Sequence, residues 1–173
     1  MARGTRLELR PAALAANARQ ARAHAGDAGV YAMVKANAYG HGLEPAARAL
    51  APEVDGFGIA VLEEAAALRG QGIVHPLMLL EGFFDGDELA ESARLELEVV
   101  LHSDWQVRLL EVDPRPLRVW LKVNTGMHRL GVPQARVREL LQRLCVIEGV
   151  QVLGVMTHFA CADQAGDEMT GRQ

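Results

Sequence analysis

Short apolar segments recur along the chain, separated by longer segments with helical patterning. Six segments of mainly apolar and β-branched residues are predicted to be strands: 30–34, 56–60, 76–80, 97–101, 119–123 and 152–156. Near-continuous apolar character is typical of strands that are covered on both faces, as in a parallel sheet. Strands that alternate with helices therefore predict βαβ units and an α/β fold.

The intervals between these segments contain helical patterns. Four stretches predict helices: 43–50, 62–70, 103–112 and 132–144. Ser103 and Asp104 are candidate caps at the start of the third stretch, and Pro133 lies near the expected first turn of the fourth. The apolar residues of the fourth stretch recur at helical spacing, which predicts one buried face: Val137, Leu140, Leu141 and Leu144.

The two ends of the chain do not fit a simple one-domain picture. Residues 5–10 alternate like a half-buried strand, and residues 11–25 are predicted to be helical. Residues 167–173 carry no cap, turn or finishing strand, so we expect the chain to stop inside an element. With no linker, charge block or close repeat, the sequence predicts one fold that is cut off.

Composition and charge exclude several classes of protein. The chain has 173 residues, 50% of them hydrophobic, and a net charge of −4, which is ordinary for a soluble globular domain and argues against a nucleic-acid binder. No apolar run reaches membrane-spanning length, and residues 1–20 lack the apolar core of a secretory signal. Cys145 and Cys161 are not spaced as a zinc or redox pair, so free thiols in a reducing cytoplasm are expected.

The basic residues are unevenly divided between arginine and lysine. Of the 18, only Lys35 and Lys122 are lysines, which leaves 18 − 2 = 16 arginines. A coding bias towards arginine explains most of this, because a solvated surface cation can usually be either residue. A lysine that survives such a bias marks a place where amine chemistry is needed, because a guanidinium neither deprotonates nor forms an imine.

Lys35 ends a predicted strand within the segment AMVKANAYGHG, residues 32–42. An amine that is partly desolvated there favours the neutral form that attacks a carbonyl, so Lys35 suits a Schiff base. Tyr39 follows four residues later, and Gly40 and Gly42 allow close backbone approach, a setting where a phosphate could be held. The plainer alternative is a lysine that snorkels at a strand end beside an ordinary glycine turn.

Two further segments place polar residues at predicted strand ends. In WLKVNTGMHRLG, residues 120–131, Lys122 lies within the strand and Arg129 follows in a loop, where a guanidinium could grip a carboxylate through two parallel bonds. The alternative for Arg129 is a solvated loop cation, whereas an unpaired lysine inside a sheet is costly. In MTHFACAD, residues 156–163, His158 could stack on a planar cofactor.

Other polar residues have simpler interpretations. We expect no metal site, because His158, Cys161 and Asp163 have no second cluster to complete a coordination shell. Cys161 is interpreted as a buried thiol and Asp163 as a helix cap. The remaining candidates are interpreted as loop residues or residues on a solvated face: His41, His128, Glu63 and Glu64.

The three segments AMVKANAYGHG, WLKVNTGMHRLG and GVMTHFACAD, in this order and spacing, resemble the amino-terminal half of alanine racemase, a pyridoxal 5′-phosphate enzyme. The resemblance runs over essentially the whole chain. It implies that Lys35 holds the cofactor as a Schiff base and is the base for D-alanine, and that Tyr39 binds the cofactor phosphate. It also implies that Arg129 contacts the cofactor ring oxygen and the substrate carboxylate, and that His158 lies beside the pyridine ring.

At two positions the resemblance leaves the chemistry open. In some relatives the lysine at the Lys122 position is carbamylated and supports the arginine, and the sequence leaves open whether this occurs here. The family loop is often preceded by Asp, whereas this chain has Asn124. A role for a carboxylate at that point is therefore open.

The fold implied by the resemblance is a (β/α)8 barrel of the TIM type followed by a mostly β domain. About six of the eight barrel strands are expected in this chain, and such barrels typically need about 250 residues. Residues 1–10 would then be a strand of the absent β domain, and residues 11–173 a partial cofactor-binding barrel. Lys35, Arg129 and His158 all lie at or just beyond the carboxyl ends of predicted strands, which is where barrel enzymes place their catalytic residues.

The resemblance also implies a cytoplasmic homodimer in the full-length protein, with alanine as its small-molecule substrate and no nucleic-acid or membrane partner. The second base would be a tyrosine from the partner subunit, which neither Tyr31 nor Tyr39 matches. Three hypotheses follow: a racemase fragment not competent alone, a non-catalytic pyridoxal phosphate protein, or an inactive remnant. Substrate breadth, and a role in making D-alanine for peptidoglycan or in catabolising it, are left open.

Overall fold

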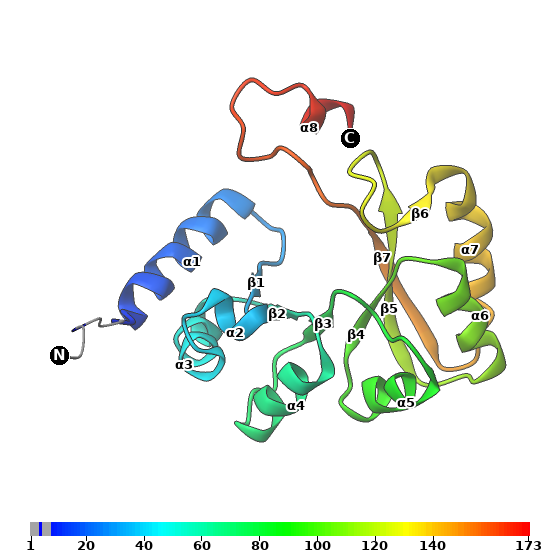
Figure 1. Ribbon diagram of the computed structural model, residues 1–173, viewed down its shortest axis with the longest axis horizontal. Coiled ribbons are helices and arrows are strands. Elements are labelled where there is room, and N and C mark those ends of the chain that lie inside the picture. Colours follow the sequence, from blue (N-terminus) through cyan, green and yellow to red (C-terminus); the bar gives the residue numbers. More distant parts are fainter. Residues whose placement is uncertain (1–3, 5–7) are drawn as a thin grey trace. The chain divides into compact units, whose positions relative to one another are not determined.

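The computed structural model describes residue 4 and residues 8–173 of the chain. These residues divide into two compact units, Met1–Leu77 and Met78–Gln173, and each unit is described by itself (Figure 1). Helices and strands alternate in both, and the strand pairs are parallel. The α/β fold predicted from the apolar pattern is therefore confirmed.

The first unit is built around one parallel strand pair. Strands β1 (Tyr31–Met33) and β2 (Gly56–Ile59) pair with Tyr31 opposite Gly56 and Met33 opposite Gly58. The helical elements of this unit are α1 (Pro11–Ala25), α2 (Lys35–Tyr39), α3 (Leu43–Leu50), η1 (Ala51–Glu53) and α4 (Leu62–Gly70). Helix α1 packs on α3, and the core of the unit includes the fully buried side chains of Phe57, Ile59 and Leu68.

The second unit holds a larger parallel sheet. Its strands are β3 (Leu77–Leu79, which begins at the unit boundary), β4 (Glu98–Leu101), β5 (Leu117–Asn124), β6 (Val132–Pro133) and β7 (Val150–Met156). Strand β5 pairs with β4 on one side and β7 on the other, and its last two residues pair with β6. The helical elements are α5 (Gly86–Arg94), α6 (Asp104–Val112), η2 (Gln134–Arg136), α7 (Val137–Leu144) and α8 (Met169–Arg172).

Strand β5 separates apolar from polar side chains by simple alternation. Leu117, Val119 and Leu121 are buried apolar residues, as expected for every second position along a strand. The intervening positions carry polar groups: Arg118 and Trp120 both bind the buried carboxylate of Glu98 on β4. The Trp120 Nε1–H donates to Glu98 Oε2 at 3.0 Å, and Arg118 Nη1 lies 3.4 Å from Oε1. Lys122 continues this polar face towards the strand end.

All six predicted strands are present, but some boundaries and elements differ. The fourth predicted helix begins at Val137, not near Pro133, because Val132 and Pro133 continue as β6 along the end of β5 before a 3-10 turn. Strand β6 and the short elements α2, α5 and α8 were not predicted. For the predicted opening strand, residues 5–7 lie outside the described residues, and residues 8–10 have no strand partner in the described part.

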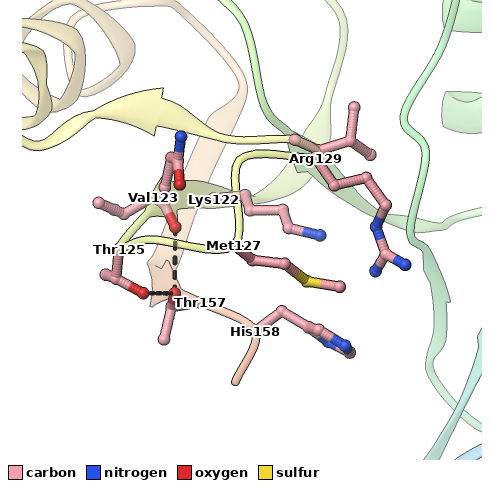
Figure 2. A pocket seen from close by; sticks show the side chains of 9 residues that line it. Lys122, Val123, Thr125, Met127, Arg129, Thr157 and His158 are labelled. Carbon is pink, nitrogen blue, oxygen red and sulfur yellow. Dashed lines mark hydrogen bonds between the residues drawn. The ribbon is translucent and has the colours of Figure 1, made fainter. Parts of the chain in front are cut away.

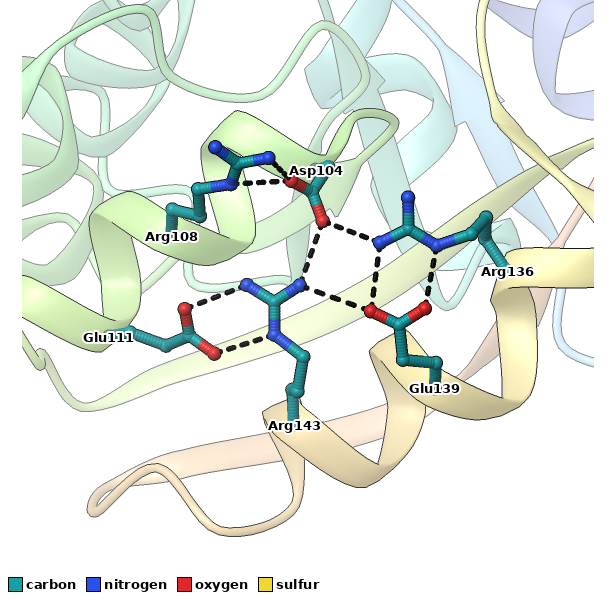
Figure 3. Close-up of polar contacts among 6 residues, drawn as sticks. All are labelled: Asp104, Arg108, Glu111, Arg136, Glu139 and Arg143. Carbon is teal, nitrogen blue, oxygen red and sulfur yellow. Dashed lines mark hydrogen bonds and ion pairs between the residues drawn. The ribbon is translucent and has the colours of Figure 1, made fainter.

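A network of charged side chains joins α6 to α7 in the second unit (Figure 3). Six residues take part: Asp104, Arg108, Glu111, Arg136, Glu139 and Arg143. Arg143 is its centre, because Nε and Nη2 each donate to Glu111 at 2.7 Å while Nη1 donates to Asp104 at 2.8 Å. Burial acts to raise the pKa of Asp104, but hydrogen bonds from Arg143 and Arg108 hold that pKa below its usual range.

We predict that Arg143→Met lowers the free energy of unfolding by about 1 kcal/mol at neutral pH, because two carboxylates lose their shared cation. The Asp104 pKa is depressed in the folded state, so the network stabilises the fold above the ordinary carboxyl pKa and loses that effect as pH falls through the folded value. Urea titrations should therefore show the difference shrinking as the pH falls below the ordinary carboxyl pKa of about 4.

The control is Arg48→Met, which removes an exposed i,i+4 pair with Glu44 and should change stability by less than half as much. An Arg143→Met deficit that is the same at acidic and neutral pH would contradict the assignment of the effect to carboxylate pairing.

Candidate functional site

Lys35 lies immediately beyond the carboxyl end of β1, where the sequence placed it. The preceding residue, Val34, is fully buried, and its N–H extends the strand ladder by donating to the Gly58 carbonyl at 2.9 Å. The side chain of Lys35 is only partly exposed. The amine is thus attached to backbone that the paired strands hold in place.

The short element α2 is not an ordinary right-handed helix, because its backbone after Lys35 forms a left-handed turn. The φ angles of four consecutive residues lie between 51° and 55°: Ala36, Asn37, Ala38 and Tyr39. Each non-glycine residue in this conformation costs roughly 1–2 kcal/mol, so four in succession need support from their surroundings. Gly40, with φ 87°, completes the turn and donates its N–H to the Ala36 and Asn37 carbonyls.

Side chains and backbone groups of the first unit hold this turn. The Ala38 N–H donates to the Val34 carbonyl at 2.8 Å, and the Leu43 N–H donates to Asn37 Oδ1 at 2.8 Å, which ties the turn to the start of α3. His41 Nδ1 lies 2.8 Å from the Ala38 carbonyl, in agreement with its interpretation as a loop residue. Tyr39 points its side chain outward, 62% exposed, so its hydroxyl is available to a ligand.

The carboxylate of Glu64 binds backbone N–H groups, although the sequence predicts that Glu64 lies with Glu63 on a solvated face. It accepts the Ala36 N–H at 2.6 Å and the Ala60 N–H at 2.9 Å, whereas Glu63 is exposed. The interpretation is therefore wrong for Glu64. The signal in the sequence was an acidic residue in the first turn of a helix, whose side chain leans back over the preceding strand ends.

In the second unit, Lys122, Arg129 and His158 line one small pocket of about 10 Å³. Figure 2 shows their three side chains extending to the same side of the pocket, with the Met127 thioether among them. Lys122 is 7% exposed, and His158 follows two residues after the end of β7. The register that sets Lys122 opposite Met156 brings the ends of β5 and β7 together. The sequence segments predicted to carry chemistry in this unit are thus adjacent.

The loop that carries Arg129 is organised by Asn124 and Gly131. Asn124 Oδ1 accepts the N–H groups of Gly126 at 3.0 Å and His128 at 3.1 Å, and its amide lies 3.1 Å from His128 Nδ1. The amide oxygen of Asn124 thus accepts the hydrogen bonds of the loop. A carboxylate oxygen at the same position could accept them equally. Gly131 has φ 118°, and a Cβ there would lie 2.6 Å from the Asn124 nitrogen, so only glycine closes the loop against β5.

Three residues that were not predicted hold the His158 segment. The hydroxyls of Thr125 and Thr157 lie 2.6 Å apart, and Thr157 donates to the Val123 carbonyl at 3.1 Å. Gln173 donates to Thr125 Oγ1 at 3.1 Å and to the His158 carbonyl at 3.0 Å, and it accepts the Ala160 N–H. These two threonines and the glutamine form no periodic pattern in the sequence, so their contacts are seen only in the structure.

The polar residues after His158 differ in part from expectation. Asp163 lies in a turn and caps no helix, because α8 begins only at Met169. Cys161 is partly exposed, and burial together with the nearby acidic Asp167 raises the pKa of its thiol. Within residues 8–173, no group of three His, Cys, Asp or Glu side chains is arranged to hold a metal ion. The described helices are also too short or too polar to cross a membrane.

Comparison with known proteins points to one family. The family described as alanine racemase, N-terminal domain, matches residues 9–173. The alanine racemase of Alcanivorax borkumensis is 53% identical over 171 residues, which cover 99% of this chain and 48% of that protein. The alanine racemase of Thioalkalivibrio sulfidiphilus is 45% identical over 177 residues, covering 100% and 49%. The chain thus spans about half the length of these curated relatives.

Solved structures agree. The alanine racemase structure from Acinetobacter baumannii matches with a TM-score of 0.86 and 33% identity, covering 94% of this chain and 49% of that one. The biosynthetic alanine racemase from Pseudomonas aeruginosa matches with a TM-score of 0.84 and 36% identity, covering 94% and 45%. The expected TIM-type barrel fold, present here as an open part without the β-rich domain, is thereby confirmed.

The left-handed turn yields a prediction about Gly40. A Cβ at Gly40 would meet no atom within 4 Å, so Gly40→Ala adds strain without a clash. We expect it to lower the free energy of unfolding by about 1 kcal/mol, because alanine disfavours φ 87°. Urea unfolding at constant pH measures the change.

Gly70→Ala is the matched control, because a Cβ there also meets open space but Gly70 lies in α4 with ordinary φ. It should be neutral or stabilise the chain by up to about 1 kcal/mol. Equal effects of the two substitutions would show that the turn is not under the strain described.

Proposed function

The chain belongs to the alanine racemase family by its amino-terminal domain, and on that basis we propose that it forms the cofactor-anchoring half of a cytoplasmic pyridoxal 5′-phosphate-dependent racemase that interconverts L-alanine and D-alanine. The observation that carries the proposal is Lys35, a lysine at the carboxyl end of a parallel strand followed by a glycine-flanked turn. Barrel enzymes place their chemistry at this edge of the sheet.

The residues present fit the cofactor in the chemistry of their donors. In the first unit, Lys35 supplies the primary amine that an aldehyde needs, and the exposed Tyr39 supplies a hydroxyl for a phosphate. In the second unit, Arg129, Lys122 and His158 line one pocket with two cations and an imidazole, which suit a phenolate oxygen, a carboxylate and a planar ring. Among the described residues that line that pocket, none has an acidic side chain that would oppose an anion.

When bound, the cofactor withdraws electrons from the substrate Cα and so makes its proton removable. We assign Lys35 two successive tasks: Nζ would hold the cofactor covalently, and, once the substrate amine had taken its place on the cofactor, the released Nζ would exchange the Cα proton on the D-alanine side. The buried Val34 and the turn after Lys35 restrict where Nζ can reach. A fixed amine is what proton transfer requires, because a general base must lie within hydrogen-bonding distance of the proton.

Arg129 is proposed to orient the substrate carboxylate and to contact the ring oxygen of the cofactor. Its guanidinium offers parallel donors in one plane, and a charge-assisted bond of this kind contributes about 1.5–3 kcal/mol. Lys122 is proposed to support Arg129 from the floor of the same pocket, with or without carbamylation. His158 is proposed to lie beside the pyridine ring.

Racemisation needs a second acid or base on the opposite face of the substrate. Neither tyrosine of this chain is suited, since the Tyr31 ring covers Gly56, where a Cβ would lie 2.4 Å from it, and Tyr39 is assigned to the phosphate. The resemblance to alanine racemase implies that the second base is a tyrosine from the partner subunit of a homodimer, and on that ground we propose that the 173 residues alone do not racemise alanine.

Borohydride reduction of the full-length, cofactor-loaded protein tests the proposal. Reduction fixes the cofactor on its lysine, and peptide mapping should find the label on Lys35. Lys35→Ala should abolish this label and lower the racemisation rate at least a hundredfold, the usual scale of a lost general base.

Lys122→Arg is the matched control, because it replaces the other lysine of the chain and should leave the label on Lys35. A label that survives Lys35→Ala at the same stoichiometry would refute the assignment. Labelling without racemisation of either alanine enantiomer would instead favour a non-catalytic cofactor-binding protein.

A further inference from the structure

Glu64 has an acidic side chain that binds the backbone directly after Lys35. It lies in the first turn of α4, and its two carboxylate oxygens bind two different strand ends. Oε1 accepts the Ala36 N–H at 2.6 Å, after β1, and Oε2 accepts the Ala60 N–H at 2.9 Å, after β2. A single carboxylate therefore links the segment that carries Lys35 to the neighbouring strand.

These bonds fix the backbone on one side of Lys35, and the sheet fixes it on the other. The Val34 N–H donates to the Gly58 carbonyl at 2.9 Å, so the residue before Lys35 is held by β2. The Ala36 N–H is held by Glu64, so the peptide after Lys35 is also set. The Val34 carbonyl, which belongs to the peptide before Lys35, accepts the Ala38 N–H at 2.8 Å. Both peptides that flank the Lys35 Cα are therefore held, and they set the direction of its Cα–Cβ bond.

The turn that follows makes this support necessary. Ala36 is the first of the four left-handed residues, with φ 52°, and its conformation decides whether the chain enters the turn or continues as a strand. A short bond to a carboxylate at this N–H favours the turn, since charge-assisted hydrogen bonds are stronger than neutral ones. Glu64 thus acts where the direction of Lys35 and the entry to the turn are set together.

We propose that Glu64 is a positioning residue for Lys35: its carboxylate holds the strained turn so that the lysine amine points at the cofactor aldehyde. The inference rests on the proposed function, since it concerns how the same lysine is presented. It predicts that the loss of one hydrogen-bond acceptor at Glu64 lowers the affinity for the cofactor by a larger free energy than it lowers the stability of the fold.

Glu64→Gln is the sharpest variant, because glutamine keeps the shape but replaces one of the two acceptors by an NH2 donor that cannot bind an N–H. In the full-length protein we expect pyridoxal 5′-phosphate to bind at least about tenfold more weakly, as measured by equilibrium dialysis. This corresponds to about 1.4 kcal/mol, at the lower end for one charge-assisted bond. The visible circular dichroism of the bound cofactor should also change, because it reports how the ring is held.

Two controls separate positioning from stability. Glu63→Gln alters the exposed neighbour on the same helix and should leave both readouts unchanged. Leu68→Val trims a fully buried side chain of α4 and should lower the unfolding midpoint while leaving cofactor affinity unchanged. If Glu64→Gln does not fold, Glu64→Asp, whose shorter side chain cannot span both N–H groups, must show the weakened binding.

The inference is overturned if Glu64→Gln, or Glu64→Asp in its place, binds the cofactor as tightly as the unchanged protein. It is also overturned if Leu68→Val weakens binding to the same degree at equal loss of stability. If either result is found while borohydride still labels Lys35, only the role of Glu64 is refuted. If borohydride does not label Lys35 in the unchanged protein, the proposed function itself is refuted.

Discussion

Parallel pairing of strands is the constraint on which the placement of every candidate residue depends. Parallel strands run in the same direction, so their carboxyl ends lie along one edge of the sheet. In the first unit this pairing joins β1 to β2 and places Lys35 beyond β1. In the second unit β5 pairs with β7, and the residues that follow these strands, Arg129 and His158, line a common pocket with Lys122.

The pairing alone does not set the direction of Lys35, because the chain leaves the sheet through a conformation that alanine and tyrosine disfavour. Four left-handed residues cost more than any single hydrogen bond returns, at roughly 1–2 kcal/mol each against about 0.5–1.5 kcal/mol for a neutral bond. The turn is therefore held by several contacts from different elements, among them Val34, Asn37 and Glu64. Strain of this kind clusters at sites where geometry serves a ligand.

The sequence predicts the strands well because each has a clear apolar signal, and it predicts the candidate lysine because the lysine ends such a run. Strand β6 has only two residues and forms because it pairs with the end of β5, so no local sequence pattern predicts it. The left-handed turn is hidden for a related reason: Ala36 and Ala38 have no preference for positive φ, and their surroundings impose it. Glu63 and Glu64 are identical in type, and only the phase of the helix decides which one reaches the strand ends.

The division of cations between arginine and lysine has a structural counterpart. The cations of the network between α6 and α7 are all arginines, and Arg143 shows the reason, because its planar fork binds Glu111 through two nitrogens and Asp104 through a third. A lysine ammonium has no such fork and could not match both carboxylates. Lys35 instead follows the end of β1, and Lys122 lies near the end of β5. The two lysines among the 18 basic residues thus both lie near the carboxyl end of a parallel strand, the edge at which barrel enzymes place their chemistry.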